Sequence, residues 1–276
     1  MGIKPSITKT ALATIASLLC LYAQAFPKDF NSRRPDDCGY FMCQYEKENI
    51  DSVILWHARQ SRSLMFGEIH DSVMPGTPPP LEDSLYVISI LKGLKAIGYR
   101  YLALEVQKDA PLHTHSHDLQ LCLKNFRSGK TIRVRDYPFA KPGWIDLMLA
   151  AVKIGFQPVF FDPFTAGADR DADMFRSIKE QIFDRDTHAK VLVYVGAGHI
   201  RKLETRDGLS RRLSRRQPLG LLLNNFTGGK NYSVYVGYPD DAPAGCDLII
   251  SSFVWNAFRQ SFQPLQALPC DKADAQ

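Results

Sequence analysis

Apolar segments that end near a glycine alternate with longer segments of helical spacing, and this alternation limits what the chain can fold into. Apolar segments buried on both faces are typical of parallel strands, and intervening helices cover the two faces of the sheet. The sequence therefore predicts an α/β fold: a single domain with a mostly parallel central sheet, helices on both faces, and a helical insertion at about residues 109–145. Helices are expected at 47–60, 81–98, 143–155 and 171–183. Strands are expected at 63–66, 99–106, 157–164, 189–199, 219–226, 231–238 and 247–253.

The N-terminus has the pattern of a signal peptide. Lys4 and Lys9 precede an apolar segment that ends in Ala23-Gln24-Ala25, which predicts cleavage between Ala25 and Phe26. The apolar segment is shorter than the roughly 20 residues that span a bilayer. We therefore expect a secreted or periplasmic protein whose mature chain has no integral membrane span. The predicted organisation is a signal peptide (1–25), an irregular lead (26–48) and an α/β domain (49–276).

The net charge bears on the possible partners, and the cysteine content bears on disulfide bonds. The formal net charge of +5 over 276 residues is modest and does not by itself argue for nucleic acid, so we expect no nucleic-acid partner. The expected partner is a small-molecule or peptide substrate. Removal of the signal peptide leaves five cysteines, and an oxidising compartment favours disulfide bonds among some of them. Cys38 with Cys43 and Cys246 with Cys270 are the candidate pairs, whereas the apolar surroundings of Cys122 predict a buried thiol.

Polar residues stand where several predicted strands end. Glu68 and His70 belong to the segment GEIH, and His199 ends the segment VGAGH, so a Gly-x-x-His pattern follows two buried strands. Glu105 and Asp162 end two further strands. Because the carboxyl ends of parallel strands share one edge of the sheet, we expect these side chains to form a common site.

Several of these residues also have structural explanations. Glu105 lies in an apolar strand, where a carboxylate must be paired or bound to a cation, and Arg170 or Arg176 could pair with it or bind a substrate. The acidic residues at 169, 171 and 173 suit a helix N-terminus. The segment HTHSHD (113–118) is either a solvated loop or a metal-binding loop.

Four motifs in order resemble the Tiki/TraB, ChaN-like and erythromycin-esterase-like superfamily. They are FGEIH, YLALEV, RDADMFRSI and VGAGH, within residues 50–200. The resemblance implies an α/β fold in which both Gly-x-x-His segments and a glutamate face one pocket. It also implies one of several activities, because some members are metal-dependent proteases, some are metal-independent esterases, and ChaN-like lipoproteins bind haem.

Carried over by position, the resemblance makes Glu68, His70, Glu105 and His199 the candidate catalytic residues. The same four are the candidate ligands of a divalent transition metal, and Arg170, Arg176 and Asp162 are candidate substrate-binding residues. We expect a hydrolase of esterase or protease type in which His70 or His199 acts as general base, with or without a metal. The alternatives are a haem-binding uptake protein and a non-catalytic secreted effector on the same scaffold.

Overall fold

The computed structural model describes residues 44–45, 47–68, 81–163, 169–203, 205–206, 215–237, 243, 245–251 and 265–268. All of them belong to one compact unit, Cys43–Gln276. The predicted signal peptide and His70 lie outside the described residues, as do Cys38, Cys43 and Cys270. The signal peptide, the cleavage site and the disulfide pairs therefore stay predictions.

The main sheet formed by the described residues has eight strands in the order β1-β10-β9-β8-β2-β5-β3-β4. The six strands from β9 to β4 pair in parallel, whereas β10 and β1 pair antiparallel at one edge. The prediction of a mostly parallel sheet is confirmed. The bounds are β1 (Gln44–Tyr45), β2 (Ser63–Glu68), β3 (Tyr101–Gln107), β4 (Gln157–Asp162), β5 (Val191–Gly196), β8 (Asn231–Gly237), β9 (Leu248–Ser251) and β10 (Leu265–Leu268). Two short strands, β6 (Thr205–Arg206) and β7 (Arg215–Arg216), form a separate antiparallel pair.

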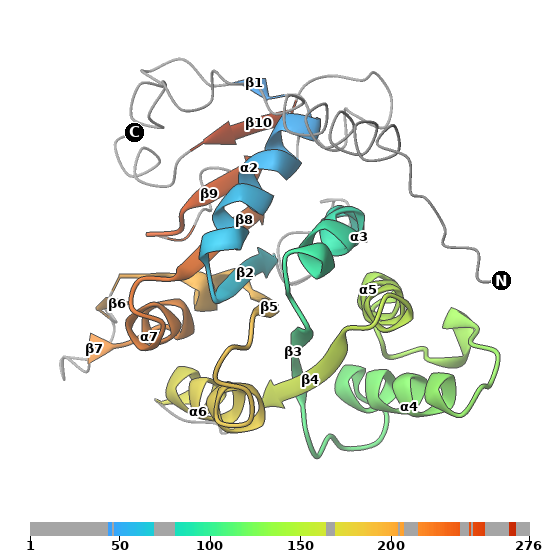
Figure 1. Ribbon diagram of the computed structural model, residues 1–276. Helices are drawn as coiled ribbons and strands as arrows, with labels where there is room; N and C mark the ends of the chain where they lie inside the picture. The colour runs from blue at the N-terminus through green and yellow to red at the C-terminus, as the bar shows by residue number, and fades with distance from the viewer. Residues whose placement is uncertain are drawn as a thin grey trace, which may run out of the picture. The chain divides into compact units, whose positions relative to one another are not determined.

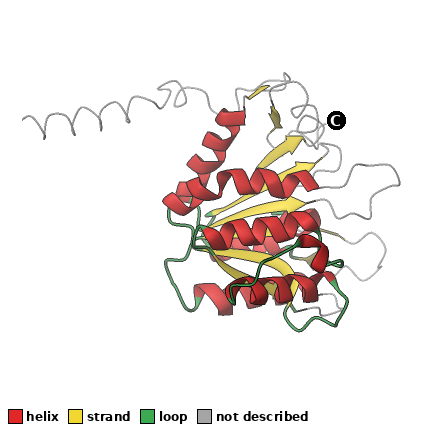
Figure 2. Cartoon of the chain, turned by 90° about the vertical axis from the view of Figure 1, so that its right-hand side faces the viewer, coloured by secondary structure: helices red, strands yellow, loops and turns green. Residues whose placement is uncertain are grey.

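Helices cover both faces of this sheet (Figures 1 and 2). The α5 face carries α2 (Lys47–Gln60), α3 (Leu81–Ala96), α4 (His115–Arg127) and α5 (Pro142–Lys153). The α6 face carries α6 (Arg170–Ile178), which continues as the π-helix η4 (Lys179–Phe183), and α7 (Leu219–Phe226). Two 3₁₀ helices, η3 (Val134–Asp136) and η5 (Ala197–Ile200), complete the described elements.

Alternating strand residues fill two separate cores. In β2, Leu64 and Phe66 belong to the core under α3 and α5, whereas Met65 belongs to the core under α6 and α7. In β3, Leu104 and Ala103 divide between the two cores in the same way. This two-residue period follows from strand geometry. It also decides which face receives a polar side chain at the end of each strand.

One predicted strand is wrong. Residues 219–226 form helix α7, in which Leu219 and Leu223, four positions apart, pack into the core on the α6 face. A short continuous apolar segment fits a buried strand and a buried helix equally well, so periodicity alone does not separate them. The high helix propensity of leucine agrees with the observed structure.

The insertion after β3 contains a helix that begins earlier than expected. Thr114 caps α4, and its side chain accepts a hydrogen bond from the backbone N–H of His117 at 3.2 Å. The expected loop HTHSHD is therefore mainly the first turn of a helix, and His113 precedes it with a φ of 60°. Cys122 on this helix is a buried free thiol, as predicted, and burial raises its pKa to about 11.

Within the part of the chain that the structure describes, no helix has both the length and the apolar character needed to cross a bilayer.

Candidate functional site

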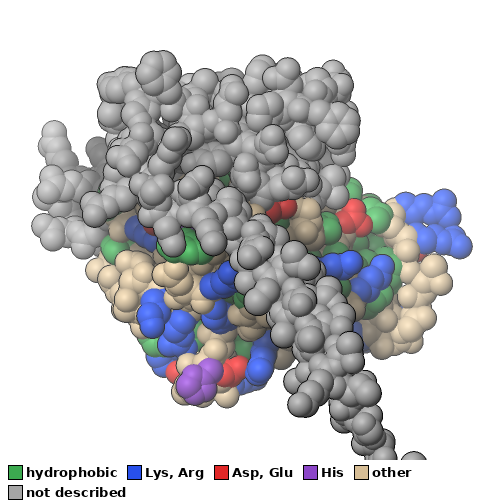
Figure 3. All heavy atoms as spheres, turned by 45° about the horizontal axis from the view of Figure 1, so that its top comes forward, with side chains coloured by type: hydrophobic (Ala, Val, Ile, Leu, Met, Phe, Trp, Pro, Cys, Tyr) green, Lys and Arg blue, Asp and Glu red, His purple; other side chains and the backbone are tan. Residues whose placement is uncertain are grey.

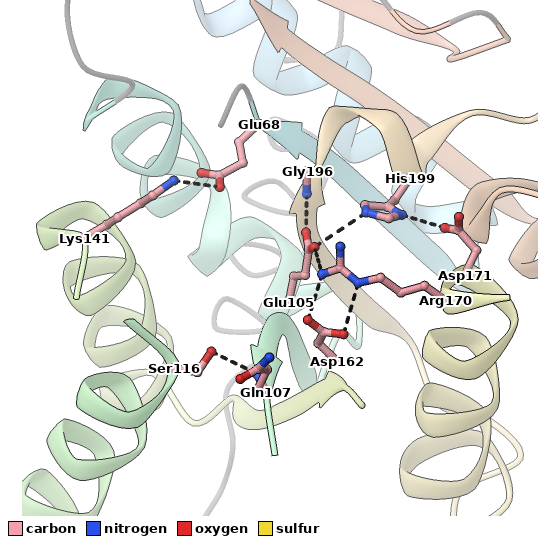
Figure 4. A network of polar contacts seen from close by, with 10 residues as sticks. All are labelled: Glu68, Glu105, Gln107, Ser116, Lys141, Asp162, Arg170, Asp171, Gly196 and His199. Atoms are coloured by element: carbon pink, nitrogen blue, oxygen red, sulfur yellow. Dashed lines mark hydrogen bonds and ion pairs between the residues drawn. The ribbon is translucent and has the colours of Figure 1, made fainter. Parts of the chain in front are cut away.

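A salt-bridge cluster joins the ends of β3 and β4 to the start of α6 (Figure 4). The Nη2 atom of Arg170 donates to Oε1 of Glu105 at 2.7 Å and to Oδ2 of Asp162 at 2.8 Å, and its Nε donates to Oδ1 of Asp162 at 3.3 Å. Both carboxylate side chains are almost completely buried, whereas Arg170 is 37% exposed. The guanidinium therefore compensates two buried negative charges and remains accessible from outside.

His199 lies beside this cluster. Its Nδ1 is 2.6 Å from Oδ1 of Asp171, and its Nε2 is 3.6 Å from Oε1 of Glu105. The same Asp171 oxygen accepts a hydrogen bond from the backbone N–H of Leu219, the first residue of α7, at 3.0 Å. Asp171 thus holds the imidazole ring at one nitrogen and leaves the other nitrogen facing Glu105 (Figure 4).

The surroundings of His199 raise its pKa above the ordinary 6.5. Burial lowers the pKa, and the charge of Arg170 does the same, but the hydrogen bond to Asp171 and the negative charges of Glu105 and Asp171 outweigh them. The same cluster raises the pKa of Arg170: burial opposes the rise, and the hydrogen bond to Asp162 and the nearby carboxylates overcome it. The site therefore holds a histidine that changes charge above its usual pH range.

Two strand-end glycines lie beside this cluster. A Cβ on Gly67 would lie 2.7 Å from Cδ1 of Ile200 and 3.0 Å from Cα of Ala197, so the absence of a side chain lets η5 pack closely against the end of β2. Gly196 ends β5, and its backbone N–H donates to Oε2 of Glu105 at 2.7 Å. The first half of each Gly-x-x-His motif thus serves packing and the positioning of Glu105.

Glu68 lies at the end of β2 on the α5 face of the sheet. Glu68 is two residues beyond Phe66 and four beyond Leu64, so its side chain points to the same face of the sheet as theirs. It is 2% exposed. Its Oε2 accepts a hydrogen bond from Nε1 of Trp144 at 2.9 Å, and Nζ of Lys141 is 3.5 Å from its Oε1. Figure 4 shows its side chain directed toward Lys141 and away from His199. Glu68 is therefore held by its own partners at the start of α5.

The structure brings together four of the predicted site residues: Glu105, His199, Arg170 and Asp162. It directs Glu68 to the other face of the sheet, and His70 lies outside the described residues. Arg176 is 64% exposed and pairs with Asp173 at 2.8 Å, so it does not join the cluster.

The described residues of the cluster do not form a set of ligands for a divalent metal, and His70, one of the predicted ligands, lies outside them. In the described part of the chain, no group of three or more His, Cys, Asp or Glu side chains is arranged to hold a metal ion. Arg170 already lies between Glu105 and Asp162 and supplies the positive charge that a metal would bring.

Three residues that contact His199 or Glu68 were not predicted as site residues from the sequence. Asp171 was explained as an acid at a helix N-terminus, although it stands beside Arg170 in the RDADMFRSI motif and contacts His199. Trp144 and Lys141 contact Glu68 from the start of α5, and no motif marks them.

The fold and the site together define an α/β protein with a partly buried His–Asp and Arg–carboxylate cluster at the carboxyl edge of its parallel strands. No protein-family model matches the chain, and no curated protein matches it.

Solved structures that are similar to this chain include a bacterial effector, a toxin structure and a haem-binding protein. The type III effector HopBA1 is 12% identical with a TM-score of 0.41, and the match covers 75% of this chain and 90% of that one. A structure described as "Bacterial protein toxins" is 14% identical with a TM-score of 0.46, and the match covers 84% of this chain and 48% of that one. Haem-bound ChaN of Campylobacter jejuni is 11% identical with a TM-score of 0.40, over 72% and 92% of the two chains. These values assign no family and no activity to this chain.

Proposed function

We propose that this protein is a hydrolase in which His199 is the acid–base group. The observation that carries the proposal is the environment of one imidazole ring, with Asp171 2.6 Å from Nδ1 and Glu105 3.6 Å from Nε2. A histidine oriented by a carboxylate at one nitrogen can exchange a proton with a reactant at the other. Its side chain is 16% exposed, so this nitrogen is shielded but not sealed from solvent.

The geometry supports a direct attack by water. The distance of 3.6 Å between Nε2 of His199 and Oε1 of Glu105 is too long for a direct hydrogen bond. A water molecule that donates a hydrogen bond to each of these atoms would turn its oxygen lone pair toward a substrate carbonyl. As the water oxygen bonds to the carbonyl carbon, its proton passes to Nε2. The imidazolium, stabilised by Asp171, then returns a proton to the leaving oxygen or nitrogen as the scissile bond breaks.

Arg170 is suited to stabilise the oxyanion that this attack creates. Its Nε and Nη2 donate to Asp162 and Glu105, whereas Nη1 makes no hydrogen bond to another described residue. A guanidinium at a water-poor site stabilises developing negative charge strongly. The predicted substrates, small esters or peptides, have the carbonyl group that this arrangement requires.

The first prediction concerns His199→Ala. With p-nitrophenyl esters and casein as substrates, we expect this variant to lose at least about 100-fold in kcat/KM, because general acid–base groups contribute roughly that much or more. His188→Ala is the matched control, since His188 is exposed and lies outside the cluster. Both variants should keep the thermal unfolding temperature within a few degrees.

A haem titration separates the hydrolase from the alternative prediction. If haem addition gave a Soret band that His199→Ala abolished, while no ester or peptide were hydrolysed, the protein would be a haem-binding protein. If neither hydrolysis nor a Soret band were found, a non-catalytic effector would be favoured.

A further inference from the structure

The segment from Lys108 to Lys141, here called the basic–apolar segment, exposes an unusual number of apolar side chains. Seven large hydrophobic side chains of the described residues are exposed, and four of them belong to this segment. These four are Leu112 (69%), Leu121 (37%), Val134 (37%) and Phe139 (48%). Scattered exposed apolar residues are ordinary, but their concentration in one segment points to a contact surface.

The same segment holds most of the net charge of the protein. It has seven Lys or Arg residues and three Asp residues, a formal charge of +4 with histidines neutral, while the whole chain has +5. The rest of the chain is thus close to neutrality. Five basic residues between 124 and 135 are exposed: Lys124, Arg127, Lys130, Arg133 and Arg135. On the part of the face in Figure 3 that grey atoms do not cover, Lys and Arg side chains are more abundant than Asp and Glu.

Packing contacts fix the shape of this segment. The ring of His113 packs edge-on against Phe139, with centroids 5.4 Å apart. The backbone N–H of Phe139 donates to Oδ2 of Asp118 at 2.9 Å, which joins the C-terminal part of the segment to α4 within it. Nδ2 of Asn125 donates to the hydroxyl of Tyr137 at 3.1 Å. Leu112 and Phe139 are therefore displayed from a folded segment.

We propose that the basic–apolar segment binds the surface of a membrane that contains anionic lipids. Lys and Arg side chains bind lipid headgroups, and exposed Leu, Val and Phe side chains insert at the boundary between headgroups and acyl chains. The combination favours a lipid surface over an acidic protein or a nucleic acid, because charge alone would satisfy those partners. This mode of binding is peripheral and needs no membrane-spanning helix.

The test is sedimentation with vesicles. Purified protein is mixed with vesicles of phosphatidylcholine alone or of equal parts phosphatidylcholine and phosphatidylglycerol, and the excess of binding to the anionic vesicles is measured. Any contribution of the N-terminus, which carries Lys4 and Lys9, is common to all variants, so the comparison between variants isolates the segment. The triple variant Arg127→Gln, Arg133→Gln, Arg135→Gln should bind anionic vesicles about 100-fold more weakly, since each basic residue near the surface contributes about a fivefold factor.

A control triple variant removes three exposed basic residues elsewhere: Lys153→Gln, Arg185→Gln, Lys230→Gln. It should keep the wild-type affinity for anionic vesicles. Leu112→Ser should weaken the binding that persists in high salt, because its effect is apolar. Equal losses in both triple variants, or no preference of the wild type for anionic vesicles, would overturn the proposal. The protein could also fail to bind vesicles but be retained on immobilised polyglutamate, with the segment's triple variant retained less. That result would assign the surface to an acidic protein instead.

Discussion

At the scale of single residues, Asp171 has the most specific role in the cluster. Its Oδ1 accepts from Leu219 N–H and contacts Nδ1 of His199, and its charge helps to raise the pKa of His199. Because the folded pKa is above 6.5, protonation of His199 stabilises the protein fully below pH 6.5. That contribution is lost as the pH rises through the folded pKa.

The second prediction is a shift in pH dependence on Asp171→Asn. Without this carboxylate, burial continues to lower the pKa of His199 while one opposing charge is removed, so the pKa falls. If His199 acts as a base, the rising acid limb of the kcat/KM profile should move to lower pH, and the plateau should drop by about tenfold or more. NMR titration of the His199 ring checks the pKa directly. An unchanged titration would show that Asp171 does not set it.

The third prediction concerns Arg170→Met. This variant leaves Glu105 and Asp162 buried without their cation, and we expect the free energy of unfolding to fall by about 3 kcal/mol. Arg176→Met removes an exposed pair with Asp173 and should cost about 0.5 kcal/mol or less. Denaturant unfolding measures both. Adding Glu105→Gln to Arg170→Met should recover part of the loss, and a further loss would contradict the charge argument.

At the scale of elements, the N-terminus of α7 is positioned by close backbone packing. A Cβ on Gly220 would lie 2.3 Å from the carbonyl oxygen of Ile200 and 2.6 Å from that of Arg201. These neighbours are backbone atoms, so they cannot move aside as a side chain would. The helix start that donates to Asp171 therefore depends on a glycine at this position.

The fourth prediction follows from this packing. Gly220→Ala should lower the free energy of unfolding by about 2 kcal/mol or more, because the added methyl group overpacks a rigid contact. It should also reduce hydrolysis, since displacement of α7 disturbs Asp171. Gly198→Ala is the control for stability, because an added Cβ there meets nothing within 4 Å. Comparable unfolding curves for the two variants would refute the packing argument.

Most elements of the fold could be predicted from the sequence, since strands β2 to β5 and their helices have strong patterns. Residues 219–226 could not, because an apolar segment of this length fits either structure. We expected polar residues at the carboxyl ends of parallel strands to lie together, and Glu105, Asp162 and His199 do lie at one edge of the sheet. This expectation could not show that Glu68 faces the other side of the sheet. The face depends on which residues of each strand point to which side, and on the helices that cover that side.

At the scale of the whole molecule, the order of strands could not be predicted from the order of the chain. β2 is the first of the six parallel strands in sequence, but it pairs with β5 and β8, which come much later. Its Ser63 is in register with Val191 on one side and with Asn231 on the other. The site depends on this order, because Gly196 of β5, which binds Glu105, lies beside the end of β2.

This strand order has a consequence for biosynthesis. A ribosome completes β2 when residue 68 is made, whereas β5 ends at Gly196 and β8 ends at Gly237. The central strand therefore has no partner until most of the chain has been synthesised, and pairing over such separations is slow. During that time β2 has no strand to pair with on either side. The topology is thus compatible with export before folding, as the predicted signal peptide requires.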